Sequence, residues 1–113
     1  MIWQKSRKLV KQIYILSKAF PKSEIYGLTS QIRRCSVSVP SNIAEGFQRH
    51  SKKEYLQFLY ISYGSLAELE TQLVLARDLN YLTLKETELI LENVVTIQKM
   101  INSLISKLKS SGR

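Results

Sequence analysis

The sequence predicts an all-α fold, an antiparallel up-down four-helix bundle. Apolar residues recur every three or four positions along four separate stretches, a spacing that places them on one side of a helix. Glycine and proline together occupy only six positions, so these stretches are rarely interrupted. The breaks between the stretches are short, and short loops make successive helices antiparallel neighbours.

The first helix is predicted to run from about Trp3 to Phe20 and to end before Pro21, which cannot continue a helix. Its apolar positions are Leu9, Val10, Ile13, Leu16 and Phe20. This stripe marks the side of the helix that is expected to face the other helices.

The stretch SVSVPSNIAEG, residues 36–46, alternates serine and valine like a strand, yet an apolar stripe continues through it at helical spacing. That stripe consists of Leu28, Ile32, Cys35, Val39, Ile43 and Phe47. A strand here would lose the stripe and would have no partner strand, so we predict one helix that is kinked at Pro40. Short polar side chains are expected to satisfy the backbone groups that the proline frees: Ser36, Ser38, Ser41 and Asn42.

Capping boxes predict where the third and fourth helices begin. Ser51-Lys52-Lys53-Glu54 begins a helix that runs to about Leu79, and Thr83-Leu84-Lys85-Glu86 begins the last helix after a turn at 80–82. The heptad of the third helix consists of Tyr55, Leu59, Ser62, Leu66, Leu69, Leu73 and Ala76. The heptad of the fourth helix consists of Ile90, Val94, Ile97, Ile101, Leu104 and Leu108. Two heptad helices and two amphipathic helices indicate a bundle.

The third and fourth helices carry more apolar residues than one seam needs. The surplus residues are Leu56, Tyr60, Tyr63, Ala67 and Val74 on the third helix and Leu91, Val95 and Ile105 on the fourth. An outer helix of a monomeric bundle usually keeps its far side polar, so the surplus favours an interface between subunits. The alternative is a third helix that is buried at the centre of the bundle.

Gly64 lies inside the third helix, where glycine costs about 1 kcal/mol relative to alanine. Folding the second and third helices together near residues 49–50 places Gly64 level with Cys35 and Ser36. We expect the two backbones to approach closely at this level, so that a leucine at position 64 would clash and destabilise the fold.

Two ion pairs are predicted. The register of the second and third helices brings Glu68 within about a turn of Arg33 and Arg34, which indicates a partly buried pair. Glu45 is followed by Arg49 at the fourth position along the helix, the favourable order for an exposed pair.

The length of 113 residues predicts a single domain, residues 1–113. A hydrophobic content of 44% is typical of a globular protein. No apolar run reaches the ~20 residues that a helix needs to cross a bilayer, and no signal-peptide pattern follows the basic N-terminus. The single cysteine, Cys35, cannot form an internal disulfide. We therefore expect a cytoplasmic protein that has no membrane partner.

The net charge of +8 lies wholly at the two ends of the sequence. Residues 1–23 hold six basic residues and residues 93–113 hold four, in both cases without an acidic residue. Residues 24–92 hold seven basic and nine acidic residues. A basic field favours a polyanion such as nucleic acid, or an acidic protein surface. The alternative is a charge excess that serves solubility and has no partner.

The sequence predicts no catalytic site, no metal site and no cofactor. The single histidine, His50, lies in the turn between the second and third helices, without a nucleophile or a ligand set nearby in sequence. Cys35 falls on the apolar stripe, where a cysteine usually packs as a small core residue. The carboxylates of Glu68 and Glu70 lie on different faces of their helix. We expect that the protein is not an enzyme.

Two stretches resemble a known family, SVSVPSNIAEG and EYLQFLYISYGSLAELETQLVLARDLNYL. They resemble the bacterial four-helix-bundle family known as S23 ribosomal protein, whose members include proteins encoded by intervening sequences within large-subunit ribosomal RNA genes. The sequence is also similar to the accessory variability protein of diversity-generating retroelements, a basic pentamer that works with a reverse transcriptase and its RNA. The resemblance implies a homopentamer of antiparallel four-helix subunits and no settled activity. The resemblance places the motif residues of the family on Pro40, Asn42, Glu45, Gly46, Gly64, Ser65, Glu68 and Glu70. Most of them are expected to have a structural role.

Two functions remain open. The first is an oligomer that binds nucleic acid, RNA in preference to DNA, such as ribosomal RNA, through phosphate contacts. The predicted contact residues are Lys5, Arg7, Lys8, Lys11, Lys18, Lys22, Lys99, Lys107, Lys109 and Arg113. Because the first and fourth helices are neighbours in this fold, the basic residues near the two termini are expected to form one patch. The second function is a module that docks an acidic or nucleic-acid-processing protein.

Overall fold

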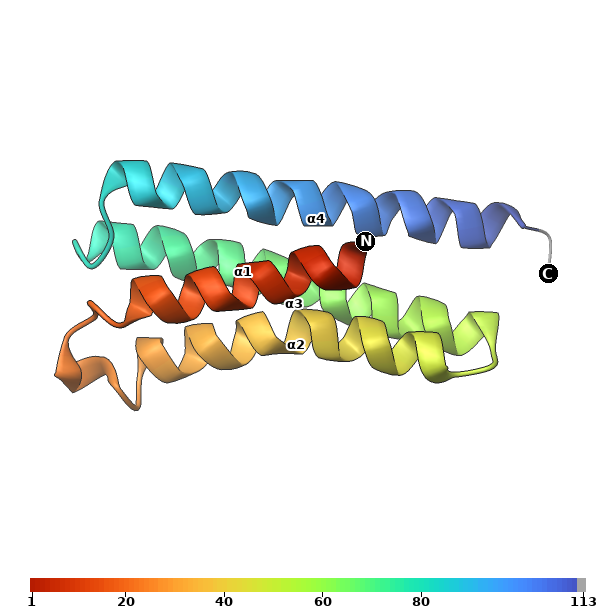
Figure 1. The fold of residues 1–113 in the computed structure, drawn as a ribbon, viewed down its shortest axis with the longest axis horizontal. Helices are drawn as coiled ribbons and strands as arrows, with labels where there is room; N and C mark the ends of the chain where they lie inside the picture. The colour runs from red at the N-terminus through yellow and green to blue at the C-terminus, as the bar shows by residue number, and fades with distance from the viewer. Residues whose placement is uncertain (112–113) are drawn as a thin grey trace.

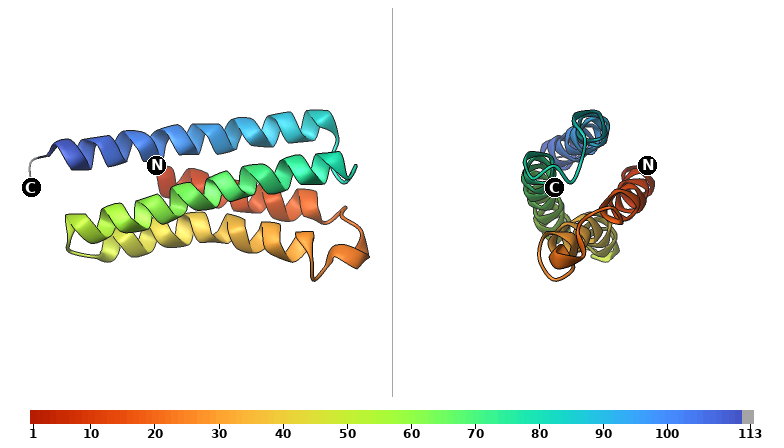
Figure 2. Two further views of the ribbon diagram at one scale, coloured as in Figure 1. Left: turned by 180° about the vertical axis from the view of Figure 1, so that it is seen from behind. Right: turned by 90° about the vertical axis from the view of Figure 1, so that its left-hand side faces the viewer.

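The structure, a computed structural model, describes residues 1–111 and contains four long helices that run alternately up and down (Figure 1). They are α1 (Ile2–Ser17), α2 (Leu28–Gln48), α3 (Lys52–Asp78) and α4 (Leu84–Ser110), with a short 3₁₀ helix, η1 (Lys22–Glu24), between α1 and α2. Each helix packs against the next, and α1 also packs against α4, so the four follow one another around the bundle axis (Figure 2). The predicted all-α four-helix bundle is confirmed.

The helix α1 is shorter than its partners, with 16 residues against 27 in both α3 and α4. The side-chain amide of Asn93 donates to Gln12 Oε1 at 2.9 Å and sets the register between α4 and α1. With this register the last turns of α4 extend beyond the first residue of α1 (Figure 1). Within residues 1–111, no helix has a stretch long and apolar enough to cross a membrane.

The first helix ends at Ser17, earlier than the predicted end at Phe20. The N–H groups of residues 18–20 donate to carbonyls three positions back, at 3.1–3.3 Å, so the chain tightens out of the α-helix. Pro21 disfavours the α conformation at the residue before it, which explains why the regular helix stops short of Phe20.

The second helix continues through Pro40, as the apolar stripe predicts. Pro40 has no N–H group, so the carbonyl of Ser36 has no helical donor. The neighbouring polar side chains bond to other carbonyls. The hydroxyl of Ser36 donates to the Arg33 carbonyl at 2.8 Å, and the amide of Asn42 donates to the Ser38 carbonyl at 2.8 Å. The helix therefore neither unwinds nor restarts, whereas the kink at Pro40 stays a prediction.

Both predicted starts of the long C-terminal helices are confirmed. Thr83 forms a complete capping box, since its hydroxyl accepts from the Glu86 N–H at 3.0 Å and the Glu86 carboxylate accepts from the Thr83 N–H at 2.9 Å. At Ser51 the hydroxyl accepts from the Glu54 N–H at 3.3 Å, but the Glu54 carboxylate turns to Arg49, at 3.4 Å.

The turn between α3 and α4 is a Schellman motif centred on Asn80. Its φ of 64° lies in the left-handed region, which asparagine adopts more readily than most residues. The N–H of Tyr81 donates to the Ala76 carbonyl at 2.8 Å, and that of Asn80 to the Arg77 carbonyl at 2.9 Å. The predicted turn at 80–82 is thus confirmed, and these two bonds end α3 sharply.

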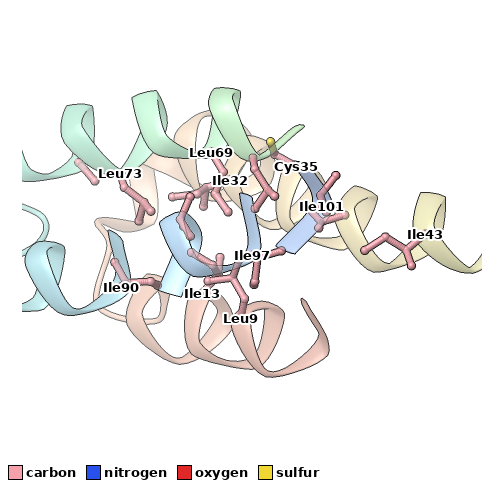
Figure 3. Close-up of a cluster of buried hydrophobic side chains, with 14 of the residues drawn as sticks. Leu9, Ile13, Ile32, Cys35, Ile43, Leu69, Leu73, Ile90, Ile97 and Ile101 are labelled. Carbon is pink, nitrogen blue, oxygen red and sulfur yellow. The ribbon is translucent and has the colours of Figure 1, made fainter. Parts of the chain in front are cut away.

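Side chains from all four helices meet in one apolar core (Figure 3). Those labelled in the figure are Leu9 and Ile13 from α1, Ile32, Cys35 and Ile43 from α2, Leu69 and Leu73 from α3, and Ile90, Ile97 and Ile101 from α4. Phe47, the last residue of the predicted stripe on α2, is instead 69% exposed. The first residues of α1 line a groove together with Phe47 and leave this side chain uncovered.

The close approach between α2 and α3 lies at Gly46 and not at Gly64. A Cβ atom at position 46 would lie 2.7 Å from Phe58 Cβ and 3.1 Å from Tyr55 Cδ1. At position 64 an added Cβ would have no such neighbour within 4 Å. The expected clash of a larger residue at position 64 is therefore wrong.

The register of α2 and α3 is nevertheless close to the predicted one. Cys35 Sγ donates to the Ser65 carbonyl at 3.1 Å, and Ser62 Oγ donates to the Val39 carbonyl at 3.0 Å. The contact falls on Ser65, one position beyond the expected one. Because each helical residue turns by about 100°, this shift by one leaves Gly64 on the outer face of α3.

The predicted ion pair of Glu68 with Arg33 or Arg34 is wrong: the salt bridges among the described residues do not include it. Arg33 lies on the side of α2 that faces α1, where its Nε donates to Ser17 Oγ at 2.8 Å. The guanidinium of Arg34 donates along its own helix to Ser30 Oγ at 3.3 Å. Arg33 thus holds α1 against α2.

Half of the surplus apolar residues on α3 and α4 are used within the subunit. Those that are buried or pack against the core are Leu56, Tyr63, Leu91 and Ile105. Tyr60, Ala67 and Val95 are exposed, and Val74 is half-buried. The surplus stripe alone therefore does not require a second subunit to cover it.

Glu24 of η1 caps α2 from outside, a contact that the sequence did not suggest. Its carboxylate accepts from the Leu28 N–H at 3.1 Å and from the Tyr81 hydroxyl at 2.8 Å, and so ties the start of α2 to the turn before α4. The bonds from Leu28 and Tyr81 lower the pKa of Glu24, and the bond to Glu24 raises the pKa of Tyr81.

Replacing Tyr81 by phenylalanine is expected to lower the melting temperature near neutral pH, and by less in acid. Because the pKa of Glu24 is lower in the folded state, its ionised form stabilises the fold above its unfolded pKa, about 4. That stabilisation is lost as the pH falls through the folded pKa. Thermal unfolding by circular dichroism at several pH values, with Tyr26→Phe as the control, measures the difference. A difference that does not change with pH would contradict the role of Glu24.

Candidate nucleic-acid interface

One end of the bundle combines the start of α1, the turn between α2 and α3, and the end of α4 (Figure 1). We call this region, residues 1–8, 45–55 and 99–111, the open end, because α4 extends past α1 there. The ammonium group of Lys52 donates to Ser111 Oγ at 3.0 Å, which joins the start of α3 to the end of α4. The ammonium group of Lys109 lies 5.5 Å from the ring centre of Tyr60, a second link between these helices.

The open end carries the whole charge excess of the described residues. It holds nine basic and two acidic side chains, whereas the rest of residues 1–111 holds seven of each sign. The nine basic residues are Lys5, Arg7, Lys8, Arg49, Lys52, Lys53, Lys99, Lys107 and Lys109. Eight of them are exposed and Lys52 is half-buried. The molecule is therefore strongly basic at one end and balanced along its remaining length.

Both acidic residues of the open end are paired with one arginine. The guanidinium of Arg49 lies 3.0 Å from a carboxylate oxygen of Glu45 and 3.4 Å from one of Glu54. The pair with Glu45 confirms the prediction from spacing. The pair with Glu54 connects the end of α2 to the first turn of α3. Among residues 1–111, the lysines of the open end form no salt bridge.

Aromatic rings support several cations at the open end. The guanidinium of Arg7 lies 4.7 Å from the ring centre of Trp3, and that of Arg49 lies 5.2 Å from the ring centre of Phe58. Such contacts orient a cation at the surface without neutralising it. The open end thus presents positive charge beside flat apolar rings.

An apolar groove of about 660 Å³ opens between these helices. It is lined by Met1, Ile2, Trp3, Gln4, Ile43, Ala44, Phe47, Gln48, Tyr55 and Leu104. The rings of Phe47 and Tyr55 meet edge to face, with centres 6.0 Å apart. The groove exists because α1 begins here, so the ends of the other helices are only partly covered.

The family model described as 23S rRNA-intervening sequence protein matches residues 1–103. The chain belongs to this family. A crystal structure of a protein of unknown function from the S23 ribosomal protein family of Bacteroides thetaiotaomicron is 26% identical, with a TM-score of 0.86, and the match covers 93% of this chain and 98% of that one. Among curated proteins no relative matches. The resemblance seen in the sequence is confirmed at the level of the family.

In this member of the 23S rRNA-intervening sequence protein family, the predicted contact residues divide between the two ends of the bundle. Lys5, Arg7, Lys8, Lys107 and Lys109 lie at the open end, and Lys99 is level with the first turns of α1. Lys11 lies in the middle of α1. Lys18 and Lys22 lie at the opposite end, since a helix rises 1.5 Å per residue and Lys18 is about 20 Å from Lys5. Arg113 lies outside the described residues.

Three basic residues of the open end were not among the predicted contacts: Arg49, Lys52 and Lys53. They belong to the middle of the sequence, whose net charge is negative, so a count by sequence segment hides them. The topology could have revealed them. In an up-down four-helix bundle the second turn lies at the same end as both termini.

The residues predicted to be motif positions of the family serve the contact between α2 and α3 unequally. Gly46 allows the close approach, and Ser65 bonds to α2 through both its carbonyl and its hydroxyl, the latter 2.9 Å from Ser38 Oγ. Pro40 is buried inside α2. Gly64 and Glu68 are exposed, and Glu70 is half-buried. The structure thus explains Pro40, Asn42, Glu45, Gly46 and Ser65 within one subunit.

The chemistry of the remaining candidates does not favour catalysis. Burial, and secondly the charge of Glu68, raises the pKa of the Cys35 thiol to about 11, so the thiol stays protonated near neutral pH and is a poor nucleophile. His50 is exposed in the turn after α2. Among the described residues, no three histidine, cysteine, aspartate or glutamate side chains come together as a metal site would require.

Proposed function

We propose that this protein is a non-enzymatic, self-associating scaffold whose open end binds RNA. The observation that carries the proposal is the confinement of the whole charge excess of residues 1–111 to one end of the bundle. Solubility alone would be served as well by charge spread over the surface. A concentrated patch of lysine and arginine instead attracts the phosphate backbone and releases its counterions.

Ribosomal RNA is the first ligand that we propose. The family model is named for the intervening sequences of 23S rRNA, and a structured RNA presents the dense phosphate charge that nine basic side chains fit. Phosphate contacts position an RNA without reading its sequence, so binding should be weakly sequence-specific. No step of this proposal requires a cofactor or a metal ion.

Self-association is supported by the outer face of α3. Ile61 and Leu75 are each about half exposed, and they lie two heptads apart on the same face of the helix. Gly64 lies on that face between them, and its missing side chain leaves open space in the single subunit. A neighbouring subunit that packs on this face would explain a glycine that the fold of one subunit does not use. We propose five copies, as the resemblance implies.

Sedimentation of the protein with a labelled fragment of 23S ribosomal RNA tests both parts of the proposal. The protein alone should sediment well above its monomer mass of 13.1 kDa, with five copies expected. The RNA should co-sediment with it at about 50 mM salt and be released at about 200 mM. A monodisperse monomer at micromolar concentration would contradict the assembly. An RNA that stays free at low salt, while the protein captures a specific acidic protein, would favour the docking function instead.

A further inference from the structure

We infer that the groove at the open end receives an unpaired base of the RNA, so that the preferred ligand is a single-stranded segment and not a continuous duplex. This inference rests on the proposed function, because it assumes that RNA approaches the open end. It adds the class of RNA and the place where a base is held.

The lining of the groove suits the face of a base. Phe47 is 69% exposed and Trp3 is 43% exposed, although both are large apolar side chains at the edge of a core. Every base has a flat π-face that stacks on such rings whatever its sequence. The groove volume, about 660 Å³, falls within the roughly 300–1,000 Å³ that is usual for small-ligand sites.

The charge around the groove selects a nucleotide over an uncharged apolar partner. Arg7 stacks on Trp3 at 4.7 Å from its centre, so a cation stands directly beside the groove wall. Arg49 and Lys52 lie in and after the turn that follows Phe47. A phosphate backbone that follows these cations would place its bases against the aromatic wall. This combination of a basic track and stacking rings is typical of proteins that bind single strands.

A duplex cannot use the groove in the same way. Its bases are stacked on one another and paired, so their faces are closed to a protein ring. Loops, bulges and ends of structured RNA offer free bases, and these are the parts that proteins usually recognise by stacking. The groove therefore predicts a preference that phosphate contacts alone would not produce, since a duplex has the higher charge density.

Trp3 reports directly on this groove, because it is the only tryptophan of the chain. The probes are a short single-stranded RNA of mixed sequence and the blunt duplex that it forms with its complement. We expect the single strand to quench the emission of Trp3 in a saturable way and the duplex to leave it nearly unchanged. Stacking of a base near an indole ring is the physical reason for the quenching.

Phe47→Ala should weaken binding of the single strand by about tenfold and leave duplex binding unchanged. The matched control is Tyr26→Ala, which removes a 95% exposed ring beyond the other end of α2 and should change neither affinity. Both side chains are exposed, so neither variant should unfold.

Equal losses for strand and duplex, or a strand that binds without changing Trp3 emission, would overturn the inference while the phosphate-binding function stands. A change of oligomer size in Phe47→Ala, without an effect on the strand, would assign the groove to a second copy of the chain and would also overturn it. If the parent protein binds neither RNA, the proposed function itself fails.

Discussion

Gly46→Ala is expected to destabilise the fold by roughly 1–3 kcal/mol, whereas Gly64→Ala should stabilise the fold of a single subunit by about 0.5–1 kcal/mol. Both glycines lie inside helices, so both variants gain the same intrinsic helix propensity. At position 46 the new methyl would lie 2.7 Å from Phe58 Cβ, an atom next to the backbone that moves only if α3 moves. At position 64 the methyl would meet open space.

Thermal and denaturant unfolding at one protein concentration compare the two variants with the parent, because the proposed self-association would make stability depend on concentration. The opposite signs are the decisive result. Two variants of equal stability would mean that α2 and α3 do not approach at Gly46. Because the proposed assembly packs a neighbouring subunit on the face that carries Gly64, the methyl of Gly64→Ala should also weaken self-association, which sedimentation of this variant measures.

The sequence predicted the helices well because their signals are local. The apolar stripe through Pro40 correctly outweighed the alternation of serine and valine, since burial of Ile32, Val39 and Ile43 favours one continuous helix. The capping residues Ser51 and Thr83 marked the starts of α3 and α4 correctly, because a cap needs only side chains within one turn.

Contacts between helices were harder to predict because they depend on the exact register. Cys35 contacts Ser65, one position beyond the expected contact at Gly64. With this register Gly64 faces outward, and Glu68 does not pair with Arg33 or Arg34. The exposure of Phe47 depends on where α1 begins relative to α2, which periodicity does not reveal. Such errors of one residue matter because each residue rotates a side chain by about 100°.

The candidate interface was predicted in part. Lys5, Lys8, Lys107 and Lys109 were expected to come together from the two termini, and all four lie in the segments of α1 and α4 that form the open end. Lys18 was grouped with them because it is close in sequence, but a rigid helix carries it to the opposite end. Lys53 was missed because residues 24–92 carry a net negative charge as a whole, although the fold brings Lys53 to the basic open end.

Neutralising four lysines at the open end should weaken RNA binding by about a hundredfold, a far larger effect than the same charge change elsewhere. The open-end variant replaces Lys5, Lys8, Lys53 and Lys107 by glutamine. The matched control replaces Lys18, Lys22, Arg34 and Lys85 by glutamine. All eight side chains are exposed, and each variant lowers the net charge from +8 to +4. Any difference between the variants therefore reports the position of the charge and not its amount.

Both variants should keep the helicity and the oligomer size of the parent, because none of the eight side chains contributes to the core. Circular dichroism and sedimentation check this before binding is compared. The control includes Lys18 and Lys22, which the sequence placed among the RNA contacts, so it also decides whether those residues belong to the interface.

The salt dependence of RNA affinity in these two variants tests most directly whether the open end is the nucleic-acid interface. The logarithm of the affinity falls linearly with the logarithm of the salt concentration. Each lost phosphate contact lowers the magnitude of this negative slope by about 0.7–0.9. The magnitude of the slope should fall by roughly 3 in the open-end variant, which loses four lysines, and should stay within about 0.5 of the parent value in the control. Equal slopes in the two variants would contradict an interface at the open end.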